Sequence, residues 1–299
     1  MKNKTVFITG GTGFIGSQLI KELLKDNTKI ICYGRSIEKI EQKFGTSVIA
    51  TNSFDFKNVD YVIHAACPTD SAILKNNPTQ VIDSIYSLTK QSLDFTRQHN
   101  ARYIYLSSME VYDGLDGYLT EDNVASFSPS ISRNSYPIGK ILSELLVNSY
   151  HKEYKLNTAI VRLSNIFGPG CDKESNKFFN YVIKQSLKNE DIVLKTTGNK
   201  IHNSCFIDDA VKQILLILNS TSNETFNITN EDYALTINEI CDKIIKLSNS
   251  SSTVKHELED NIYPKDSKHI ISGQKIKNLF TIKQTDFENA LLKTINYFN

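Results

Sequence analysis

A glycine-rich turn close to the N-terminus constrains this chain more than any other feature of its sequence. Gly10, Gly13 and Gly16 come directly after the apolar run Thr5–Thr9 and directly before a helical pattern that begins near Ile15. Such a turn lets the backbone approach a pyrophosphate closely and places the phosphates at the N-terminus of a helix. Because the spacing and the strand-turn-helix context agree, we predict a dinucleotide-binding βαβ unit.

The first half of the chain alternates short apolar runs with longer helical patterns. Strands are expected at residues 5–9, 29–33, 48–51, 61–65, 103–107 and 158–163, and helices at 78–99 and 135–154. Strands that alternate with helices of ten or more residues indicate βαβ units and a parallel sheet. The predicted fold class is therefore α/β, with a doubly wound parallel sheet.

The strand pattern weakens after residue 168, although helical patterns continue at 177–188, 208–218, 236–248 and 286–298. We therefore expect a dinucleotide-binding domain over residues 1–165, with 205–226 returning to it, and a smaller α/β substrate-binding lobe over 166–299. The serine-rich stretch 249–252 is compatible with either a linker or a surface turn.

Composition excludes several classes of function. A net charge of +1 over 299 residues argues against a nucleic-acid binder and against a polybasic membrane surface. No apolar window reaches the roughly 18–20 residues of a membrane span, and the N-terminus leaves no room for a signal peptide. The five cysteines have neither zinc-site nor disulfide-framework spacing. We expect a cytoplasmic protein without a metal site or membrane insertion.

The end of the second expected strand bears on which dinucleotide binds. An acidic residue there would hold a ribose 2′-hydroxyl, whereas a basic residue suits a 2′-phosphate. Residues 32–36 contain no carboxylate but include Arg35 and Ser36. The basic residue favours NADP, although an arginine also stacks on adenine in NAD enzymes. A surface arginine with no role in cofactor binding would give the same sequence pattern. NAD and NADP both stay open.

Tyr136 and Lys140 stand four residues apart at the start of an expected helix, so they share one face. A nearby ammonium stabilises a phenolate and lowers the pKa of a tyrosine, which makes the tyrosine a usable acid and base. Ser107 and Ser108 end the strand before this helix, at the sheet edge where ligands bind in such folds. The alternatives are two surface residues and an ordinary serine turn.

Five motifs occur in order along the chain: GGTGFIG at 10–16, HAA at 64–66, SSMEVY at 107–112, Tyr136-x-x-x-Lys140, and RLSNIFGPG at 162–170. Together they resemble the extended short-chain dehydrogenase/reductases, specifically the NAD-dependent epimerase/dehydratase family that acts on nucleotide sugars. The resemblance covers nearly the whole chain and implies a Rossmann fold.

The resemblance implies a role for each matching residue. Tyr136 would exchange a proton with a sugar hydroxyl, usually at C4, and Lys140 would bind the nicotinamide ribose and lower the pKa of Tyr136. Ser108, rather than Ser107, would hydrogen-bond the same sugar oxygen, and Asn165 would contact the sugar or its diphosphate. The cofactor contacts implied are Gly10, Thr12, Gly13, Phe14, Ile15, Gly16, Arg35, Ser36, Ala65, Ala66, Tyr136 and Lys140.

Glu110 separates the reactions known in this family. The dehydratases carry an Asp before this glutamate, but this chain has Met109 there, and a thioether cannot donate a proton. Dehydration is therefore disfavoured. Glu110 resembles the glutamate of nucleotide-sugar acid decarboxylases, and it would also serve as a base at C3 or C5 in an epimerase. A purely structural glutamate is the alternative.

The expected diphosphate contacts depart from the family pattern. His202 stands where an arginine is usual, and no arginine lies near Ser267-Lys268-His269. Histidine is mostly neutral at pH 7 and lacks the bidentate fork of arginine. Either Lys200 and Lys268 compensate, or the substrate is not an ordinary nucleotide diphosphosugar.

The leading hypothesis is an NAD(P)-dependent nucleotide-sugar epimerase that works through a 4-keto sugar. The alternatives are an NADPH-dependent 4-keto-sugar reductase, a decarboxylase in which Arg133 or Lys173 would bind the C6 carboxylate, and a non-catalytic cofactor-binding protein. The resemblance also implies a homodimer through the helices at 78–99 and 135–154, and a role in polysaccharide biosynthesis.

Overall fold

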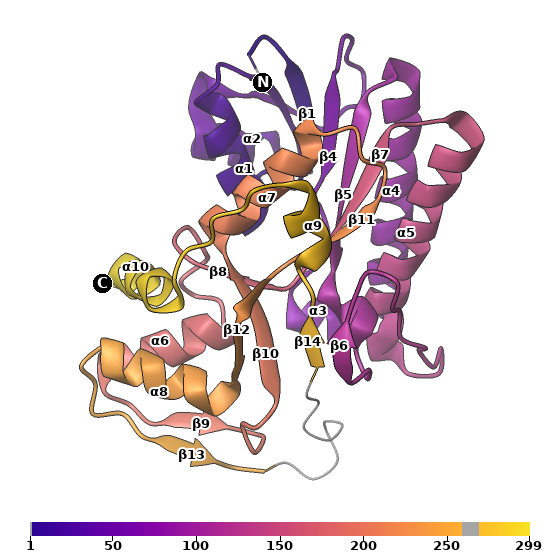
Figure 1. Cartoon of the computed structure of the whole chain (residues 1–299). Coiled ribbons are helices and arrows are strands. Elements are labelled where there is room, and N and C mark those ends of the chain that lie inside the picture. The colour runs from indigo at the N-terminus through magenta and orange to yellow at the C-terminus, as the bar shows by residue number, and fades with distance from the viewer. Residues whose placement is uncertain (1, 259–268) are drawn as a thin grey trace. The chain divides into compact units, whose positions relative to one another are not determined.

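The computed structural model describes residues 2–258 and 269–299 of the chain, which forms two compact units (Figure 1). Unit 1 comprises Met1–Val111, Val124–Leu163 and Val211–Phe226, and unit 2 comprises Tyr112–Asn123, Ser164–Ala210 and Asn227–Asn299. These units differ from the domains expected from the sequence chiefly at residues 112–123. That segment groups with unit 2 because the Tyr112 hydroxyl donates a hydrogen bond to Asn227 and strand β6 (Gly117–Leu119) pairs with strand β14 (His269–Ile271). No local sequence pattern reveals these two long-range contacts.

Unit 1 is built on a seven-stranded sheet with the strand order β11-β7-β5-β4-β1-β2-β3. Neighbouring strands from β3 to β7 pair in parallel, which confirms the predicted doubly wound α/β class. The strands are β1 (Thr5–Thr9), β2 (Lys29–Tyr33), β3 (Ile49–Thr51), β4 (Tyr61–His64), β5 (Arg102–Ser108), β7 (Thr158–Leu163) and β11 (Thr225–Ile228).

Helices flank this sheet, and α4 and α5 pack side by side against β4, β5 and β7 (Figure 1). The helices are α1 (Phe14–Leu24), α2 (Ile37–Phe44), α3 (Ser71–Asn76), α4 (Pro78–His99), α5 (Ser135–Tyr154) and α7 (Ile207–Asn219), with 3-10 turns at Gly45–Ser47, Met109–Tyr112 and Ser132–Asn134. The Asp70 carboxylate caps α3, and Asn100 ends α4 in the left-handed region, as helix termini require.

The core of unit 1 lies between the sheet and the α4–α5 pair. It contains Phe7 of β1, Phe95 of α4, Tyr103 and Tyr105 of β5 and Val147 of α5, all buried. Parallel strands are covered on both faces, which is why their sequences read as continuous apolar runs. This packing fixes α5 against β5, the two elements that carry the tyrosine, the lysine and the serines.

Unit 2 contains smaller sheets, β12-β10-β8, β13-β9 and β14-β6. Its elements are β6 (Gly117–Leu119), β8 (Asn165–Phe167), β9 (Ile192–Leu194), β10 (Ile201–Phe206), β12 (Asn230–Thr236), β13 (Val254–His256), β14 (His269–Ile271), α6 (Phe178–Lys188), α8 (Ile237–Leu247), α9 (Gln274–Leu279) and α10 (Phe287–Phe298). Phe167 anchors its core, with its ring against those of Phe179, Phe206, Tyr233 and Phe287.

The serine-rich stretch 249–252 is a turn within unit 2 rather than a linker. The Asn189 side-chain oxygen accepts a hydrogen bond from the Ser251 backbone N–H at 2.9 Å, and Ser252 is buried. In the described part of the chain, every helix is too short or too polar to traverse a lipid bilayer. All five cysteines are described, and each is a free thiol.

Candidate active site

The glycine-rich turn of unit 1 leaves no room for side chains at two of its positions. Gly10 has φ +72°, and a Cβ added there would lie 2.6 Å from the Ala66 nitrogen. A Cβ on Gly16 would lie 2.2 Å from the Gly10 carbonyl oxygen. The turn closes through a hydrogen bond from the Gly13 N–H to that oxygen at 3.0 Å. The glycines therefore serve a tight turn that brings backbone close to backbone.

This turn fits a dinucleotide pyrophosphate. Gly13 is the N-cap of α1, and no side chain there caps the first N–H groups of the helix. Those groups and the positive end of the helix dipole stay available to an anion. Lys43 of α2 adds a restraint, because its Nζ donates to the Thr12 carbonyl at 2.8 Å. No sequence motif singles out Lys43, since its link to the turn depends on the packing of α2.

Ala65 and Ala66 directly follow β4, which pairs with β1, the strand that leads into the glycine turn. The Ala66 N–H donates to Thr9 Oγ1 at 3.2 Å, and the Ala65 N–H donates to the Thr9 carbonyl at 3.2 Å. His64 is buried between Thr9 Oγ1 at 2.7 Å and Thr89 Oγ1 at 3.2 Å. Burial, with the Lys140 charge, lowers the pKa of His64 to about 3, so this histidine is a neutral structural link.

The residues expected at the adenosine end follow β2. Arg35 is exposed, and the Ser36 hydroxyl oxygen caps α2 by accepting from the Lys39 N–H at 3.2 Å. A serine that caps a helix still carries a hydroxyl hydrogen that can be donated elsewhere. The structure therefore places both residues beside the N-terminus of α2, which suits either a ribose hydroxyl or a phosphate.

Tyr136 and Lys140 are both buried in the first turns of α5, facing the end of β5. The Lys140 Nζ donates to the Leu106 carbonyl at 2.7 Å and lies 4.8 Å from the centre of the Tyr105 ring. Its distance to the centre of the Tyr136 ring is 5.8 Å. The Ser108 side chain lies close enough to the Tyr136 phenol to lower its pKa. The structure thus brings together the three residues predicted to act on a sugar hydroxyl.

Two opposing effects set the acidity of Tyr136. Burial raises the pKa of Tyr136 well above its ordinary value, while the Lys140 charge and the Ser108 side chain lower it. Burial also opposes the charge on Lys140, but Cys67, Tyr136 and Glu144 together raise the pKa of Lys140 above its ordinary value. Lys140 therefore stays an ammonium, and Tyr136 depends on it to release a proton.

Glu110 forms an ion pair with Arg133. One guanidinium nitrogen of Arg133 lies 2.9 Å from Glu110 Oε2. Glu110 belongs to the Met109–Tyr112 turn after β5, and its N–H donates to Ser108 Oγ at 3.2 Å. Its negative charge also opposes ionisation of Tyr136. Arg133 and Glu110 therefore join Ser108 and Tyr136 within unit 1. Arg133 is among the residues expected to bind a substrate carboxylate, but no sequence pattern reveals its ion pair with Glu110.

The remaining predicted substrate residues lie in unit 2. The Asn165 side chain is exposed on β8 and donates to the Asn203 carbonyl at 2.9 Å. His202 packs against the rings of Phe178 and Phe179, at 4.8 and 5.4 Å between ring centres. Burial, followed by the Lys200 charge, lowers the pKa of His202 to about 4, so it does not supply the cation expected of an arginine.

Two further lysines are candidates to bind anionic groups of the substrate. Lys173 in unit 2 donates to the Phe298 carbonyl at 3.3 Å and lies 4.8 Å from the centre of the Tyr297 ring. Lys173 therefore contacts the last residues of helix α10. Lys268 lies outside the described residues.

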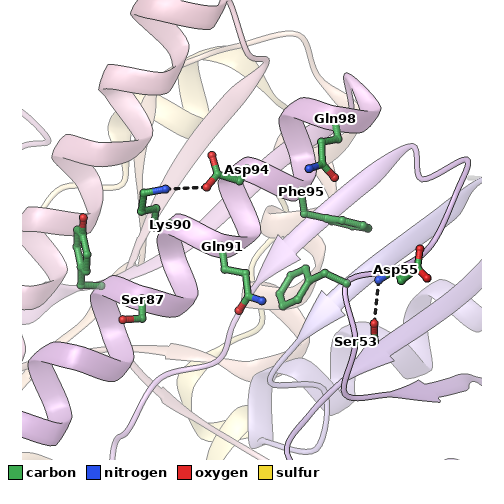
Figure 2. A pocket seen from close by; sticks show the side chains of 10 residues that line it. Ser53, Asp55, Ser87, Lys90, Gln91, Asp94, Phe95 and Gln98 are labelled. Atoms are coloured by element: carbon green, nitrogen blue, oxygen red, sulfur yellow. Dashed lines mark hydrogen bonds and ion pairs between the residues drawn. The ribbon is translucent and has the colours of Figure 1, made fainter.

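A pocket beside α4 in unit 1 is distinct from the predicted site. Figure 2 shows this pocket of about 630 Å³, which contains none of the predicted site residues. It is lined by Ser53, Phe54, Asp55, Tyr86, Ser87, Lys90, Gln91, Asp94, Phe95 and Gln98. Its lining is mostly polar and includes the Lys90–Asp94 ion pair at 2.8 Å (Figure 2). The candidate site is defined by the chemistry of its side chains rather than by this hollow.

A parallel sheet with a glycine cradle at β1 and a buried tyrosine–lysine pair on α5 defines an extended short-chain dehydrogenase/reductase. A sequence model described as "NAD dependent epimerase/dehydratase family" matches residues 6–229. The chain belongs to this family and is an NAD-dependent enzyme of its kind, which confirms the resemblance seen in the sequence motifs.

Curated relatives agree with this assignment. The chain is 27% identical to UDP-glucuronic acid decarboxylase 6 of Arabidopsis thaliana, over 76% of this chain and 70% of the relative. It is 26% identical to UDP-N-acetyl-alpha-D-glucosaminuronate decarboxylase of Bacillus cytotoxicus, over 99% of this chain and 98% of the relative.

Solved structures share the fold over nearly the full length. UDP-glucose 4-epimerase of Thermotoga maritima has a TM-score of 0.86 at 20% identity, covering 98% of both chains. UDP-glucuronic acid 4-epimerase of Bacillus cereus, solved with UDP-glucuronic acid and NAD, has a TM-score of 0.83 at 21% identity, also covering 98% of both chains.

The glycine cradle generates the first prediction. Gly16→Ala would place a methyl group against the Gly10 carbonyl and open the turn, so the purified variant should carry less than about a tenth of the dinucleotide that the wild-type protein releases on denaturation. Chromatography and mass measurement of the released compound also identify it as NAD or NADP. Gly273→Ala in unit 2 is the control, because Gly273 has φ −99°, which any residue adopts, and an added Cβ would make only an ordinary contact with Thr229 at 3.4 Å. Wild-type dinucleotide content in Gly16→Ala would contradict the assigned cradle.

Proposed function

We propose that this enzyme is a nucleotide-sugar 4-epimerase that works through a 4-keto sugar. The observation that carries the proposal is the burial of Tyr136 and Lys140 beside the half-buried Ser108 at the end of β5. A buried tyrosine beside a fixed ammonium is suited to moving one proton reversibly. In an NAD-dependent epimerase/dehydratase, this proton transfer would serve the oxidation of the hydroxyl group at C4 of the sugar.

The reaction needs a hydride to leave C4 while a proton leaves the hydroxyl group on C4. Tyr136, with its phenolate stabilised by Lys140, takes the proton of the C4 hydroxyl, while the Ser108 hydroxyl hydrogen-bonds the same oxygen. The hydride from C4 would go to NAD held in the glycine cradle and would later return from the reduced cofactor, so no external oxidant is required. When the ketone presents its other face, Tyr136 returns the proton to the oxygen, and the epimer is formed.

The residues that would hold the cofactor lie in unit 1. The backbone at Gly10, Gly13 and Gly16 would take the pyrophosphate, and Lys140 would contact the nicotinamide ribose. The remaining predicted contacts lie on the same sheet edge: Thr12, Phe14, Ile15, Arg35, Ser36, Ala65 and Ala66. Unit 1 would thus act as the cofactor domain and unit 2 as the substrate lobe.

UDP-hexoses and UDP-hexuronic acids are the proposed substrates. The solved relatives include 4-epimerases bound to UDP-glucose and UDP-glucuronic acid, and the curated relatives include decarboxylases of UDP-sugar acids. Asn165 would bind the sugar or its diphosphate. His202 would contribute a neutral aromatic contact, because its pKa is far below 7.

Decarboxylation is the second candidate, and the Arg133–Glu110 pair favours it. A 4-keto uronic acid is a β-keto acid, so its C6 carboxylate leaves as CO2 once C4 is oxidised, and C5 then takes a proton. Arg133 is a cation within this site that could bind the carboxylate, and Glu110 could move the C5 proton. The two candidates share the oxidation at C4 and differ in the fate of the 4-keto sugar.

Product analysis with UDP-glucuronic acid and UDP-glucose separates these candidates. We expect the C4 epimers, detected by NMR, with tightly held dinucleotide. A UDP-pentose and CO2 from UDP-glucuronic acid would assign the decarboxylase instead. An empty protein that binds NADPH reversibly and reduces a 4-keto sugar would assign a reductase, and tight binding without any turnover would indicate a non-catalytic cofactor-binding protein.

Tyr136→Phe tests the acid/base role directly. Removing the phenol should lower kcat by about 10²- to 10⁴-fold, because a positioned acid/base contributes this much. Bound dinucleotide should remain, since Tyr136 is not part of the glycine cradle. Tyr154→Phe is the matched control at the far end of the same helix and should keep wild-type turnover. Unchanged kcat in Tyr136→Phe would exclude the proposed mechanism.

A homodimer through α4 and α5 is also proposed. Both helices expose apolar side chains: Ile82 and Tyr86 on α4, and Leu145, which is 60% exposed, on α5. Large exposed apolar side chains on paired helices favour a partner of the same kind.

Charged substitutions should separate the dimer into single chains. Tyr86→Arg combined with Leu145→Arg should halve the mass measured by light scattering after gel filtration. Leu279→Arg, at an exposed leucine of unit 2, should leave that mass unchanged. A wild-type protein that already elutes as a single chain would contradict the dimer.

We also propose that the enzyme acts in the cytoplasm and supplies sugars for polysaccharide biosynthesis. Its five free cysteines support a reducing compartment.

A further inference from the structure

Two charged residues of α5, one helical turn apart, hold consecutive residues at the end of β5. The Lys140 Nζ donates to the Leu106 carbonyl at 2.7 Å. Glu144 Oε1 accepts a hydrogen bond from the Ser107 hydroxyl at 2.6 Å. Ser108 is the next residue on the strand. Helix α5 is therefore hydrogen-bonded to β5 immediately before the serine that is predicted to contact the sugar.

Arg162 completes this cluster from the neighbouring strand. It lies opposite Ser107 in the parallel register of β5 and β7. Its Nε donates to Glu144 Oε1 at 3.0 Å, and its terminal nitrogen donates to Glu144 Oε2 at 2.8 Å. The side chains of Arg162 and Glu144 are only 5% and 8% exposed. The pair is therefore bidentate and buried.

A buried ion pair is a poor device for stability alone. Removing two charges from water is costly, and apolar residues of similar volume often stabilise a fold equally well or better. What a bidentate pair supplies is a fixed direction and spacing, because the guanidinium and the carboxylate meet in one plane. Here that spacing is the distance of α5 from the ends of β5 and β7.

This spacing determines how the reacting groups meet. Tyr136 and Lys140 are carried by α5, while Ser108 is carried by β5. A shift of about 1 Å between such groups can cost about 10²-fold in rate. A link between the two elements next to Ser108 would therefore affect the reaction without touching the substrate.

We propose that Glu144 is a positioning residue, which uses Arg162 and Ser107 to fix α5 against the end of β5 and so aligns Tyr136 with Ser108. This inference rests on the proposed function of Tyr136 and Ser108. Glu144 has a second effect through its charge. Although burial lowers the pKa of Lys140, the Glu144 carboxylate is among the groups that raise it.

The test replaces both members of the ion pair, so that no charge is left buried alone. Glu144→Leu combined with Arg162→Met should fold and retain bound dinucleotide. Its kcat for the UDP-sugar turned over by the wild type should fall about 10- to 100-fold, with KM changed less than about threefold. Rates are taken per folded, dinucleotide-loaded protein, so that a loss of folded material is not counted as a loss of kcat.

Ser107→Ala provides a milder variant in case the double variant does not fold. It removes one hydrogen bond to Glu144 and leaves the ion pair intact, and it should lower kcat by about three- to tenfold with only the loss of thermal stability expected for one buried hydrogen bond. Ser92→Ala is the matched control, because Ser92 is a fully buried serine that bonds Tyr103 at 2.8 Å, away from the reacting groups. It should leave kcat unchanged.

Two results would overturn the inference. One is a wild-type kcat in the folded double variant, or a loss that only tracks the fraction of folded, dinucleotide-loaded protein. The other is equal kcat in Ser107→Ala and Ser92→Ala. If Tyr136→Phe abolishes turnover while these variants do not reduce it, only the role of Glu144 fails. If Tyr136→Phe is fully active, the proposed function itself fails.

Discussion

The charge on buried Lys140 is the condition on which the rest of the site depends. An ammonium removed from water is unfavourable unless polar groups replace its hydration. Here the Leu106 carbonyl, the Tyr105 ring face and nearby acidic groups take that place. Only with this charge retained can Tyr136, equally buried, release a proton. The packing of α5 on β5 is thus an electrostatic arrangement as much as an apolar one.

Much of unit 1 could be predicted from its sequence. The bounds of β1, β2, β7, α4 and α5 agree residue for residue with the expected segments, because each has a strong apolar pattern and a clear terminus. Pro78 opens α4, for example, and the left-handed Asn100 closes it. The short helices α2 and α3 escape prediction, since six to eight residues carry too little periodicity, and their serine and aspartate caps look like ordinary turns.

In the site as well, local sequence motifs could be predicted, whereas contacts between residues far apart in the sequence could not. The glycine turn and the Tyr136–Lys140 pair are local motifs, and the structure brings Ser108 to them as predicted. The partner of Arg133 and the network of Glu144 are long-range contacts between residues 18 to 37 positions apart, which spacing alone does not disclose. The neutral state of His202 likewise depends on two phenylalanines that pack around it.

The division of the chain has a consequence for its modularity. The polypeptide passes between the units after Val111, Asn123, Leu163, Ala210 and Phe226, so neither unit is one continuous segment. Three of these passages fall inside hydrogen-bonded elements: the 3-10 turn Met109–Tyr112, helix α7 and strand β11. No single cut can release either unit intact, and exchanging the smaller unit with that of a relative would require several splices at once. New specificity in such a chain is therefore expected to arise by substitutions within unit 2 rather than by shuffling of whole modules.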